Sequence, residues 1–381
     1  MRFLATWTRM SRSKHATLHG VSLFLLLLCG CHGTRPVVAM DGDCARWCRA
    51  EIPGTAGVSF RDIWGDGDHV WIVGQGGILV HGDGREWLTE RVSTHDLNAV
   101  TGDGHGHVVA VGDGGTVLEW VDGKVRASGA GEYSRYRFTG VASGAGGFWI
   151  IGGSTDGSPP EALVLRLEAG RLRTAWQPAE PGRAPFLTGV CATEAGRVIA
   201  VGGVGREPEP LLLSGNQGFE PLSLETAALP GACVGRGETV AVIDRDGLNV
   251  AILRGDGISR VGANCGDGLC EPPFQETSSP TMWLSDEHSG IAVADAIVMF
   301  RDDGYYRSVA SPGVLLDVHG AAPDDVFAVG ESGLVMHFDG NRWRTLRNSG
   351  ATLRAVWAWP GGVVAAGDGG TILVYNDKRI Q

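Results

Sequence analysis

Residues 97–123 read Leu-Asn-Ala-Val-Thr-Gly-Asp-Gly-His-Gly-His-Val-Val-Ala-Val-Gly-Asp-Gly-Gly-Thr-Val-Leu-Glu-Trp-Val-Asp-Gly. The same template returns in residues 315–340, Leu-Leu-Asp-Val-His-Gly-Ala-Ala-Pro-Asp-Asp-Val-Phe-Ala-Val-Gly-Glu-Ser-Gly-Leu-Val-Met-His-Phe-Asp-Gly. Residues 60–87 and 353–377 follow it too. Weaker copies begin near four further positions: Phe138, Leu187, Ala232 and Met282. The chain therefore contains an array of eight related units.

One glycine marks the phase of the units, because it ends the second apolar run of most copies. It recurs at six positions: Gly74, Gly112, Gly152, Gly202, Gly330 and Gly367. Two weak copies have Asp244 and Ala294 there instead. The seven intervals from the first marker to the last average about 42 residues, which matches the ~40–45 residues of a four-stranded propeller blade.

Each unit reads as four strands joined by tight turns. In residues 97–123 the first strand is the Leu-x-x-Val run, the second precedes the marker glycine, and the third follows the Gly-Gly turn. The fourth follows an Asp-Gly turn, which needs the positive φ that glycine adopts freely. The second strand is apolar at consecutive positions, so we expect both of its faces to be buried between neighbouring blades. A parallel βαβ fold is disfavoured, because no helical period separates the strands.

The two ends of the array predict how the ring closes. The last unit stops after residues 371–375, Thr-Ile-Leu-Val-Tyr, and lacks a fourth strand. Residues 46–52 resemble a fourth strand that has no unit of its own, so we expect them to form the outer strand of the last blade. The fold class is therefore all-β, a single propeller of eight blades. Seven blades is the alternative, because the fifth and sixth units are faint.

These units resemble the YVTN/WD-like propeller superfamily, nearest its Asp-box (BNR) branch and propellers of the photosystem-assembly-factor type. The resemblance covers about residues 47–377 and includes turns such as residues 338–343, Phe-Asp-Gly-Asn-Arg-Trp, which are similar to a reduced Asp box. They lack the full Ser-x-Asp-x-Gly pattern. By fold analogy, the resemblance implies a binding or assembly scaffold.

The first 31 residues read as an export signal. Four basic residues precede an apolar run over residues 21–28, which is too short for the ~20 residues that span a bilayer. The run ends in Leu-Cys-Gly-Cys31, which resembles the lipobox of bacterial lipoproteins. That resemblance implies cleavage before Cys31 and acylation of the cysteine. An ordinary secretory signal is the alternative, and Met10 is an alternative start.

This reading divides the chain into a signal peptide with lipobox over residues 1–31, a short tether over 32–45 and the propeller over 46–381. We expect an exported lipoprotein of a bacterial cell envelope, on its periplasmic side or at the cell surface. Its contact with the membrane is through the lipid anchor alone.

Six cysteines remain beyond the signal, an even number that favours disulfides in an exported chain. The local pairings are Cys44–Cys48 and Cys265–Cys270, which leaves Cys191–Cys233. The last two lie at near-equivalent places on the first strands of units four and five, so a bond there would brace adjacent inner strands. A zinc site built from the two local pairs is a weaker alternative, because neither pair has the spacing typical of structural zinc.

Charge and motifs exclude several function classes. The formal net charge of −11 argues against a nucleic-acid partner, whose phosphates need a basic surface. His105 and His107 lack further ligands at metal-binding spacing, and the turn at 66–68 lacks the later carboxylate of a calcium loop. No phosphate loop, dinucleotide fingerprint or serine-hydrolase elbow is present. We expect no metal and no cofactor.

Some Asp-box propellers are sialidases, so a glycan-binding or sialidase-like glycoside hydrolase is the alternative function. That chemistry needs an arginine cluster and a tyrosine nucleophile, but residues 60–63 lack the proline of the arginine motif and tyrosine is scarce. Tryptophans recur at equivalent sites, which indicates packing between blades rather than sugar stacking. The repeated pairs are Trp64 with Trp357, Trp71 with Trp149, and Trp87 with Trp343.

Loop lengths carry the functional hypothesis. Five links are enlarged, at residues 153–161, 203–210, 176–186, 221–230 and 262–280. All are two-to-three or four-to-one links, which leave an antiparallel blade from the same side. We therefore predict a non-catalytic binding or assembly scaffold whose contact face lies over blades three to six. Its partner is expected to be a protein, with a glycan as the lesser option. The candidate contacts are Trp176, Arg183, Arg206, Phe274 and Trp283.

Overall fold

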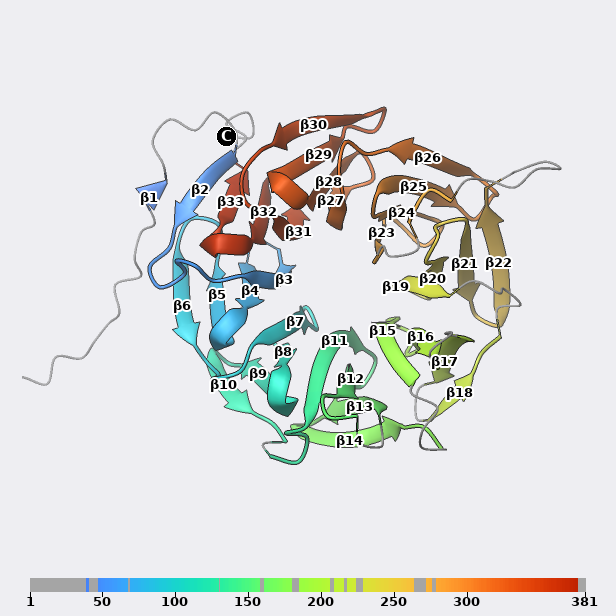
Figure 1. Cartoon of the computed structure of the whole chain (residues 1–381), viewed down its shortest axis with the longest axis horizontal. Coiled ribbons are helices and arrows are strands. Elements are labelled where there is room, and N and C mark those ends of the chain that lie inside the picture. The colour runs from blue at the N-terminus through green and yellow to red at the C-terminus, as the bar shows by residue number, and fades with distance from the viewer. Residues whose placement is uncertain are drawn as a thin grey trace, which may run out of the picture. The chain divides into compact units, whose positions relative to one another are not determined.

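The computed structural model describes residues 39–40, 47–67, 69–129, 131–157, 161–179, 185–205, 209–215, 218–223, 229–263, 272–275 and 279–375. Within these residues the chain forms eight antiparallel sheets arranged as the blades of a propeller (Figure 1). The predicted all-β fold with eight blades is confirmed, and the seven-bladed alternative is wrong. No helix in the described part of the chain is long and apolar enough to cross a membrane.

The first four blades use the strands in chain order. Blade 1 is β3 (Phe60–Asp66), β4 (His69–Gly74), β5 (Ile78–Gly82) and β6 (Trp87–Arg91). Blade 2 is β7 (Leu97–Gly102), β8 (Val108–Gly112), β9 (Val117–Val121) and β10 (Lys124–Ala127). Blade 3 is β11 (Tyr136–Gly144), β12 (Gly147–Ser154), β13 (Ala162–Glu168) and β14 (Arg171–Trp176). Blade 4 is β15 (Pro185–Ala192), β16 (Val198–Val204), β17 (Glu209–Gly215) and β18 (Phe219–Pro221).

The remaining blades continue the pattern until the last. Blade 5 is β19 (Pro230–Arg236), β20 (Thr239–Asp244), β21 (Asn249–Arg254) and β22 (Gly257–Gly262). Blade 6 is β23 (Thr281–Leu284), β24 (Ser289–Val293), β25 (Ala296–Arg301) and β26 (Tyr306–Ala310). Blade 7 is β27 (Leu315–Ala322), β28 (Asp325–Gly330), β29 (Leu334–Phe338) and β30 (Trp343–Asn348). Blade 8 is β31 (Leu353–Trp359), β32 (Gly362–Gly367), β33 (Ile372–Tyr375) and the N-terminal β2 (Trp47–Glu51), with β1 (Ala39–Met40) beside β2.

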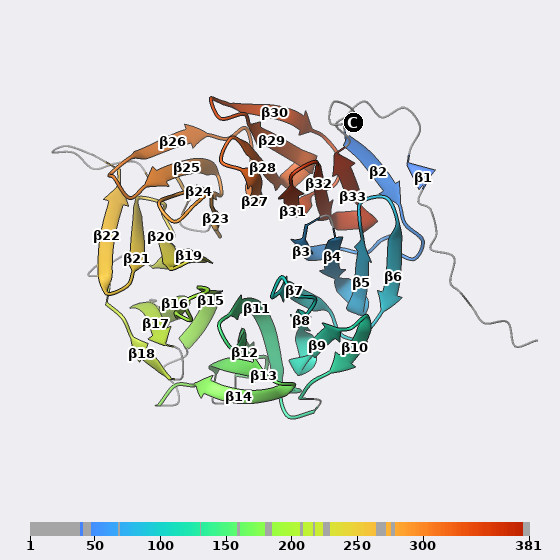
Figure 2. The same cartoon turned by 180° about the vertical axis from the view of Figure 1, so that it is seen from behind.

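The ring closes as the sequence predicts. The first strand of each blade contacts the first strand of the next, and β31 of blade 8 contacts β3 of blade 1. Strand β2 pairs antiparallel with β33, with Trp47 opposite Tyr375 and Cys48 opposite Val374. The beginning and end of the ring are thus joined in one sheet, as both views of the molecule show (Figures 1 and 2).

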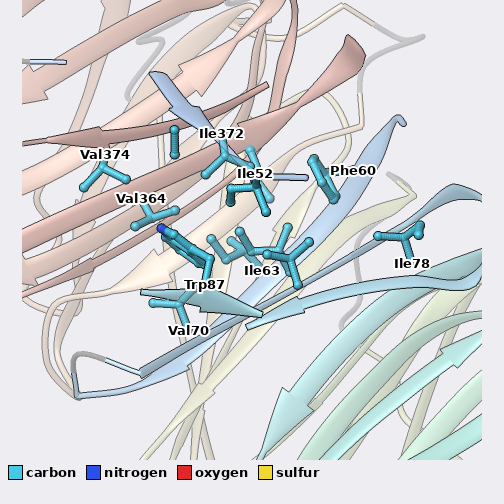
Figure 3. Close-up of a cluster of buried hydrophobic side chains, with 14 residues drawn as sticks. Ile52, Phe60, Ile63, Val70, Ile78, Trp87, Val364, Ile372 and Val374 are labelled. Atoms are coloured by element: carbon cyan, nitrogen blue, oxygen red, sulfur yellow. The ribbon is translucent and has the colours of Figure 1, made fainter. Parts of the chain in front are cut away.

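Apolar side chains fill the space between neighbouring blades. At the closure, Trp87 of β6 lies against Val364 of β32 and is only 1% exposed (Figure 3). Ile372 and Val374 of β33 join the same cluster. Because each blade buries both faces in this way, consecutive apolar residues in the second strand are required.

Glycine is needed at the marker position because a larger residue would not fit there, and not because the backbone has a positive φ. Gly330 has a φ of −169°, which any residue adopts. A Cβ on it would overlap the carbonyl oxygen of Val314, just before the first strand of its own blade. The other strong copies show the same overlap with a backbone carbonyl. Position 244 breaks the rule with a buried aspartate whose Oδ2 accepts a hydrogen bond from Asn249 Nδ2 at 2.9 Å.

Two groups of blades differ in the link between their second and third strands. In blades 7, 8, 1 and 2, here called the regular blades, this link is a three-residue 3-10 turn. The turns are η1 (Gln75–Gly77), η2 (Asp113–Gly115), η3 (Glu331–Gly333) and η4 (Asp368–Gly370). Blades 3 to 6 are called the variable blades. Each of the five enlarged links includes residues outside the described part of the chain.

Candidate functional site: the central channel

The first strand of each blade places one side chain at the centre of the ring. This residue pairs with the residue three before the marker position, as Trp64 pairs with Trp71 and His319 with Phe327. The eight residues at this channel position are Trp64, Thr101, Ala142, Cys191, Val234, Trp283, His319 and Trp357. All eight line one or both of two adjoining central cavities.

Four successive blades, 6, 7, 8 and 1, carry aromatic rings at the channel position. Trp283, His319, Trp357 and Trp64 form this aromatic arc. His319 stacks on Trp357 with ring centroids 4.0 Å apart, and Trp357 lies 6.1 Å from Trp64. The residues of blades 2 to 5 at this position are small, so the channel has one aromatic wall and one open wall.

Glycines in the following blade make room for the tryptophans of the arc. A Cβ on Gly102 would overlap the ring of Trp64, and a Cβ on Gly65 would overlap Trp357. Gly320 stands in the same relation to Trp283. The tryptophans therefore pack between blades, as the sequence indicated. Trp64 and Trp357 nevertheless remain partly exposed to the channel.

Two carboxylates lie two residues before the channel position, in blades 1 and 7. Asp62 Oδ1 accepts a hydrogen bond from Ile63 N and Oδ2 one from Val100 N of blade 2, both at 2.8 Å. Asp317 Oδ2 likewise accepts from Val356 N of blade 8 at 2.8 Å. A β-bulge just before each residue shifts the register and turns these side chains toward the channel.

Withdrawal from water controls the charge state of this wall. Burial raises the pKa of Asp62 to about 6 and that of Asp317 to about 7, although backbone N–H groups oppose the rise and the charge of Asp62 adds to it at Asp317. Burial lowers the pKa of His319 to about 4, and Arg236 acts in the same direction. His319 Nδ1 accepts a hydrogen bond from Ala358 N at 3.1 Å, so its proton is on Nε2.

The two cavities differ in size and in lining. The channel proper, about 370 Å³, is lined by the aromatic arc, Asp62, Asp317 and Arg236. The vestibule, about 1280 Å³, shares Trp64, Trp357 and Arg236 with it and opens over blades 2 to 5. Its rim is made by one-to-two and three-to-four links, including residues 103–107. The enlarged links are of the other kind, so they leave the blades from the opposite end of the strands.

The candidate contacts of the enlarged-loop face have mixed outcomes. Trp176 is half-buried at the end of β14 and packs against the cluster that contains Trp149. Arg183 and Arg206 lie outside the described residues. Phe274 is 2% exposed because it folds back over Gly247, and Trp283 is 7% exposed in the aromatic arc. The expectation that Phe274 and Trp283 present exposed side chains to a partner is therefore corrected.

The cysteine predictions are confirmed for the inner strands. Cys191 and Cys233 form a disulfide with their Cα atoms 5.9 Å apart, and this bond links the first strands of blades 4 and 5. Cys48 in β2 is disulfide-bonded. The expected partner, Cys44, lies outside the described residues, as do Cys265, Cys270 and the lipidation candidate Cys31.

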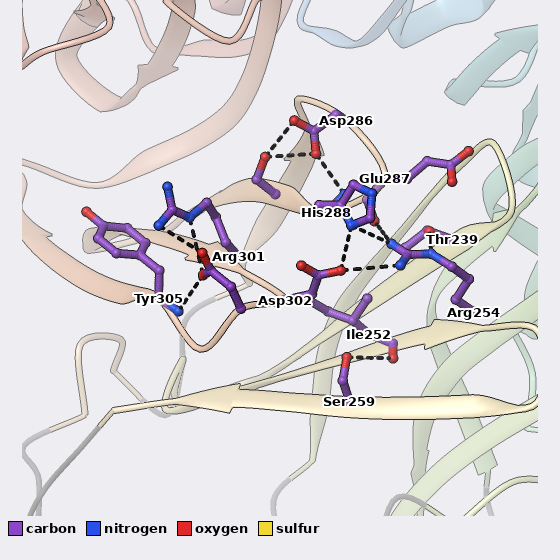
Figure 4. Close-up of polar contacts among 12 residues, drawn as sticks. Thr239, Ile252, Arg254, Ser259, Asp286, Glu287, His288, Arg301, Asp302 and Tyr305 are labelled. Atoms are coloured by element: carbon purple, nitrogen blue, oxygen red, sulfur yellow. Dashed lines mark hydrogen bonds and ion pairs between the residues drawn. The ribbon is translucent and has the colours of Figure 1, made fainter.

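Other polar clusters in the described residues have structural roles. His107 Nε2 lies 2.9 Å from Glu119 Oε2, so this histidine pairs with a carboxylate of its own blade. No group of three or more metal-ligating side chains occurs in the described part of the chain. Asp302 of blade 6 accepts from Arg254 of blade 5 and lies 2.7 Å from His288 Nδ1, which ties the two blades together (Figure 4). The nearby hydroxyl of Ser289 bonds to Asp286 instead of His288, so the cluster is no nucleophile–base pair.

The residues that the sialidase alternative requires do not converge on the channel. Arg61 points to Asp96 of the next blade, with its Nη2 2.6 Å from Oδ2. None of the described residues lining either cavity is a tyrosine. Tyr306 donates its hydroxyl to the Gly247 carbonyl, and burial raises its pKa to about 12.

Comparisons with known proteins match the fold. No protein-family model and no curated protein sequence matches the chain. A solved structure of YCF48 bound to a D1 peptide is 14% identical with a TM-score of 0.52, covering 90% of this chain and 100% of that one. The C-terminal WD40 domain of Sif2 is 9% identical with a TM-score of 0.59, covering 84% and 97%. Virginiamycin B lyase from Staphylococcus aureus is 11% identical with a TM-score of 0.53, covering 85% and 96%.

At these identities the likeness establishes the fold. The chain therefore has the β-propeller fold, as the repeats predicted. The aromatic arc and its two carboxylates were missed at the sequence level. Alignment of the first strands on their leading residues, Phe60 and Leu315, would have placed His319 in register with Trp64 and Asp317 in register with Asp62.

Proposed function

We propose that the protein is an exported, lipid-anchored propeller that acts as a non-catalytic scaffold and binds a protein partner in the cell envelope. The proposed contact face is formed by the enlarged links over blades three to six. Export and anchoring rest on the signal and lipobox that end at Cys31.

The observation that carries the proposal is the uneven distribution of link lengths. The regular blades all join their second and third strands by three-residue turns. In blades 3 and 4 the corresponding link is longer. Gly152 pairs with Leu163 and Gly202 pairs with Leu211, so the links comprise residues 153–162 and 203–210. Growth of loops on one side of a rigid ring is a common way to build a binding surface.

Two further observations support a binding role. The disulfide between Cys191 and Cys233 braces the inner strands of blades 4 and 5, each of which follows an enlarged link. Among structures with this fold, one is described as YCF48 bound to a D1 peptide, and another is a WD40 domain. Among the described residues that line the two cavities there is no tyrosine and a single arginine, Arg236, which does not favour the sialidase alternative.

The test replaces enlarged links by the short turn of a regular blade. Residues 153–162 and 203–210 would each become Asp-Gly-Gly, the sequence of Asp113–Gly115. The lipidated protein is cross-linked in its native envelope and recovered, and its cross-linked proteins are identified. We expect a defined partner to be lost from the trimmed variant.

A matched control changes a short turn on the same side. The double substitution Glu331→Asp with Ser332→Gly keeps the turn length and removes a positive φ of 54° from a serine. We expect this control to recover the partner as the wild type does. Recovery of the same partner in equal yield from the trimmed variant would disprove the contact face.

A further inference from the structure

Independently of the enlarged links, the channel holds a set of groups that suits a second ligand. The cavity that these groups line adjoins the vestibule. We propose that the channel binds the basic side chain of a polypeptide, a guanidinium or ammonium group held between the aromatic arc and the carboxylates of Asp62 and Asp317, while the peptide backbone lies in the vestibule.

The first argument is the hydrogen-bonding capacity that remains at the carboxylates. An ionised carboxylate has about four acceptor sites. The contacts at Asp62 are single backbone N–H groups, one on each oxygen. Asp317 accepts from Val356 N, from Val318 N and, at 3.5 Å, from the hydroxyl of Thr281. Both residues line the channel, so acceptor sites face a space that a donor can enter.

The second argument is the chemistry of the wall beside them. Trp64 and Trp357 are partly exposed to the channel, and the π-face of a tryptophan attracts a cation within about 6 Å of the ring. His319 is uncharged at neutral pH, because its pKa is lowered to about 4, so it adds no repulsion. An aromatic wall with carboxylates beside it favours an organic cation over an anion or a neutral group.

The third argument is the charge of the whole lining. Five carboxylates line the two cavities: Asp62, Asp317, Asp103, Glu168 and Glu194. Arg236 is the single lysine or arginine among the described lining residues. Its Nη1 donates to the carbonyl of Leu284 at 3.1 Å. The lining is therefore net negative.

Size identifies the source of the cation as a polypeptide. The channel of about 370 Å³ accepts a side chain. The vestibule of about 1280 Å³ exceeds the ~300–1,000 Å³ of ordinary small-molecule pockets. The small residues Thr101 and Ala142 leave its wall open, so a chain lying there can direct one side chain inward.

The experiment measures binding of blocked peptides to the wild-type protein by isothermal titration calorimetry. The probes are acetyl-Gly-Arg-Gly-amide, its citrulline analogue and spermidine. Citrulline has nearly the shape of arginine without its charge. We expect the arginine peptide to bind at least 10-fold more tightly than the citrulline peptide and than spermidine. Equal affinities for the two peptides would overturn the proposal, and tighter binding of spermidine would overturn its polypeptide source.

Two variants locate the site. Asp317→Asn is expected to weaken binding of the arginine peptide at least 10-fold, whereas Asp122→Asn, an equal loss of charge on an outer turn, is expected to leave it unchanged. Thr101→Arg places a guanidinium in the channel from the open wall and is expected to block the peptide, whereas Thr101→Gln is not. Because Thr101→Arg leaves both carboxylates in place, it tests the site even where Asp317→Asn fails to fold. Unchanged affinity in Thr101→Arg would refute the channel as the site.

Discussion

The regular blades and the variable blades are built from one repeat but differ in what they present to their surroundings. The regular blades have minimal turns, and three of the four aromatic-arc residues and both channel carboxylates belong to them. The variable blades have enlarged links and a disulfide between inner strands, and three of these four blades have a small side chain at the channel position. The regular blades therefore differ from the rest of the ring mainly in the side chains that face the channel. The variable blades differ mainly in the links between their strands.

We expect the largest contrast from substitutions at the marker position, compared between blade 7 of the regular group and blade 6 of the variable group. Gly330→Ala in blade 7 directs a Cβ onto the backbone carbonyl of Val314. Because that backbone cannot yield without disturbing the first strand, we expect a loss of about 3–5 kcal/mol in the free energy of unfolding. Blade 6 already has Ala294 at its marker, so Ala294→Gly should lose less than about 1 kcal/mol. Urea denaturation of both variants measures the difference, and similar losses would erase the distinction.

The disulfide between Cys191 and Cys233 is expected to stabilise the variable blades. It closes a loop with a sequence separation of 42 residues. Converting Cys191 and Cys233 together to alanine should therefore lower the free energy of unfolding by about 3 kcal/mol.

Thermal and urea melts of wild type and double variant, each with and without dithiothreitol, measure this effect. We expect dithiothreitol to lower the stability of the wild type by reducing the Cys191–Cys233 bond. The double variant lacks this bond and should show no such loss. A double variant as stable as the oxidised wild type would show that the inner strands of blades 4 and 5 need no brace.

The smallest effect, a pH dependence, belongs to the regular blades. Because the pKa of Asp317 is raised from 3.8 to about 7, the native state binds more protons than the unfolded state between these values, and stability falls as pH rises through this window. His319 opposes this between pH 4 and 6.5, because its folded pKa is the lower one. The fall is therefore clearest above about pH 6.5.

Urea denaturation at pH 6.5 and at pH 8 tests this sign. We expect the wild type to lose stability between the two and Asp317→Asn to lose less. Asp122→Asn, on an exposed turn, should keep the wild-type slope. An unchanged slope in Asp317→Asn would mean that the carboxyl is ionised throughout this range.

Repetition explains how much of this molecule could be predicted. Blade number, strand order, the closing strand and the Cys191–Cys233 bond all follow from aligning copies, because equivalent positions occupy equivalent places. The channel did not follow, since a β-bulge near the start of seven inner strands changes which side chains turn inward, and bulges leave no mark in composition. Phe274 was misjudged because it is a loop residue that fills a space over Gly247 in the blade core.

The pairing of β2 with β33 has a consequence for biosynthesis. Residues 47–51 are among the first of the ring to be made, and their partners 372–375 are the last. Until the final strand is complete, the edge strands at both ends of the incomplete ring carry backbone N–H and C=O groups without hydrogen-bond partners. A truncated product that stops short of Tyr375 keeps these unpaired edge strands. Premature termination therefore yields a chain prone to self-association rather than a smaller ring.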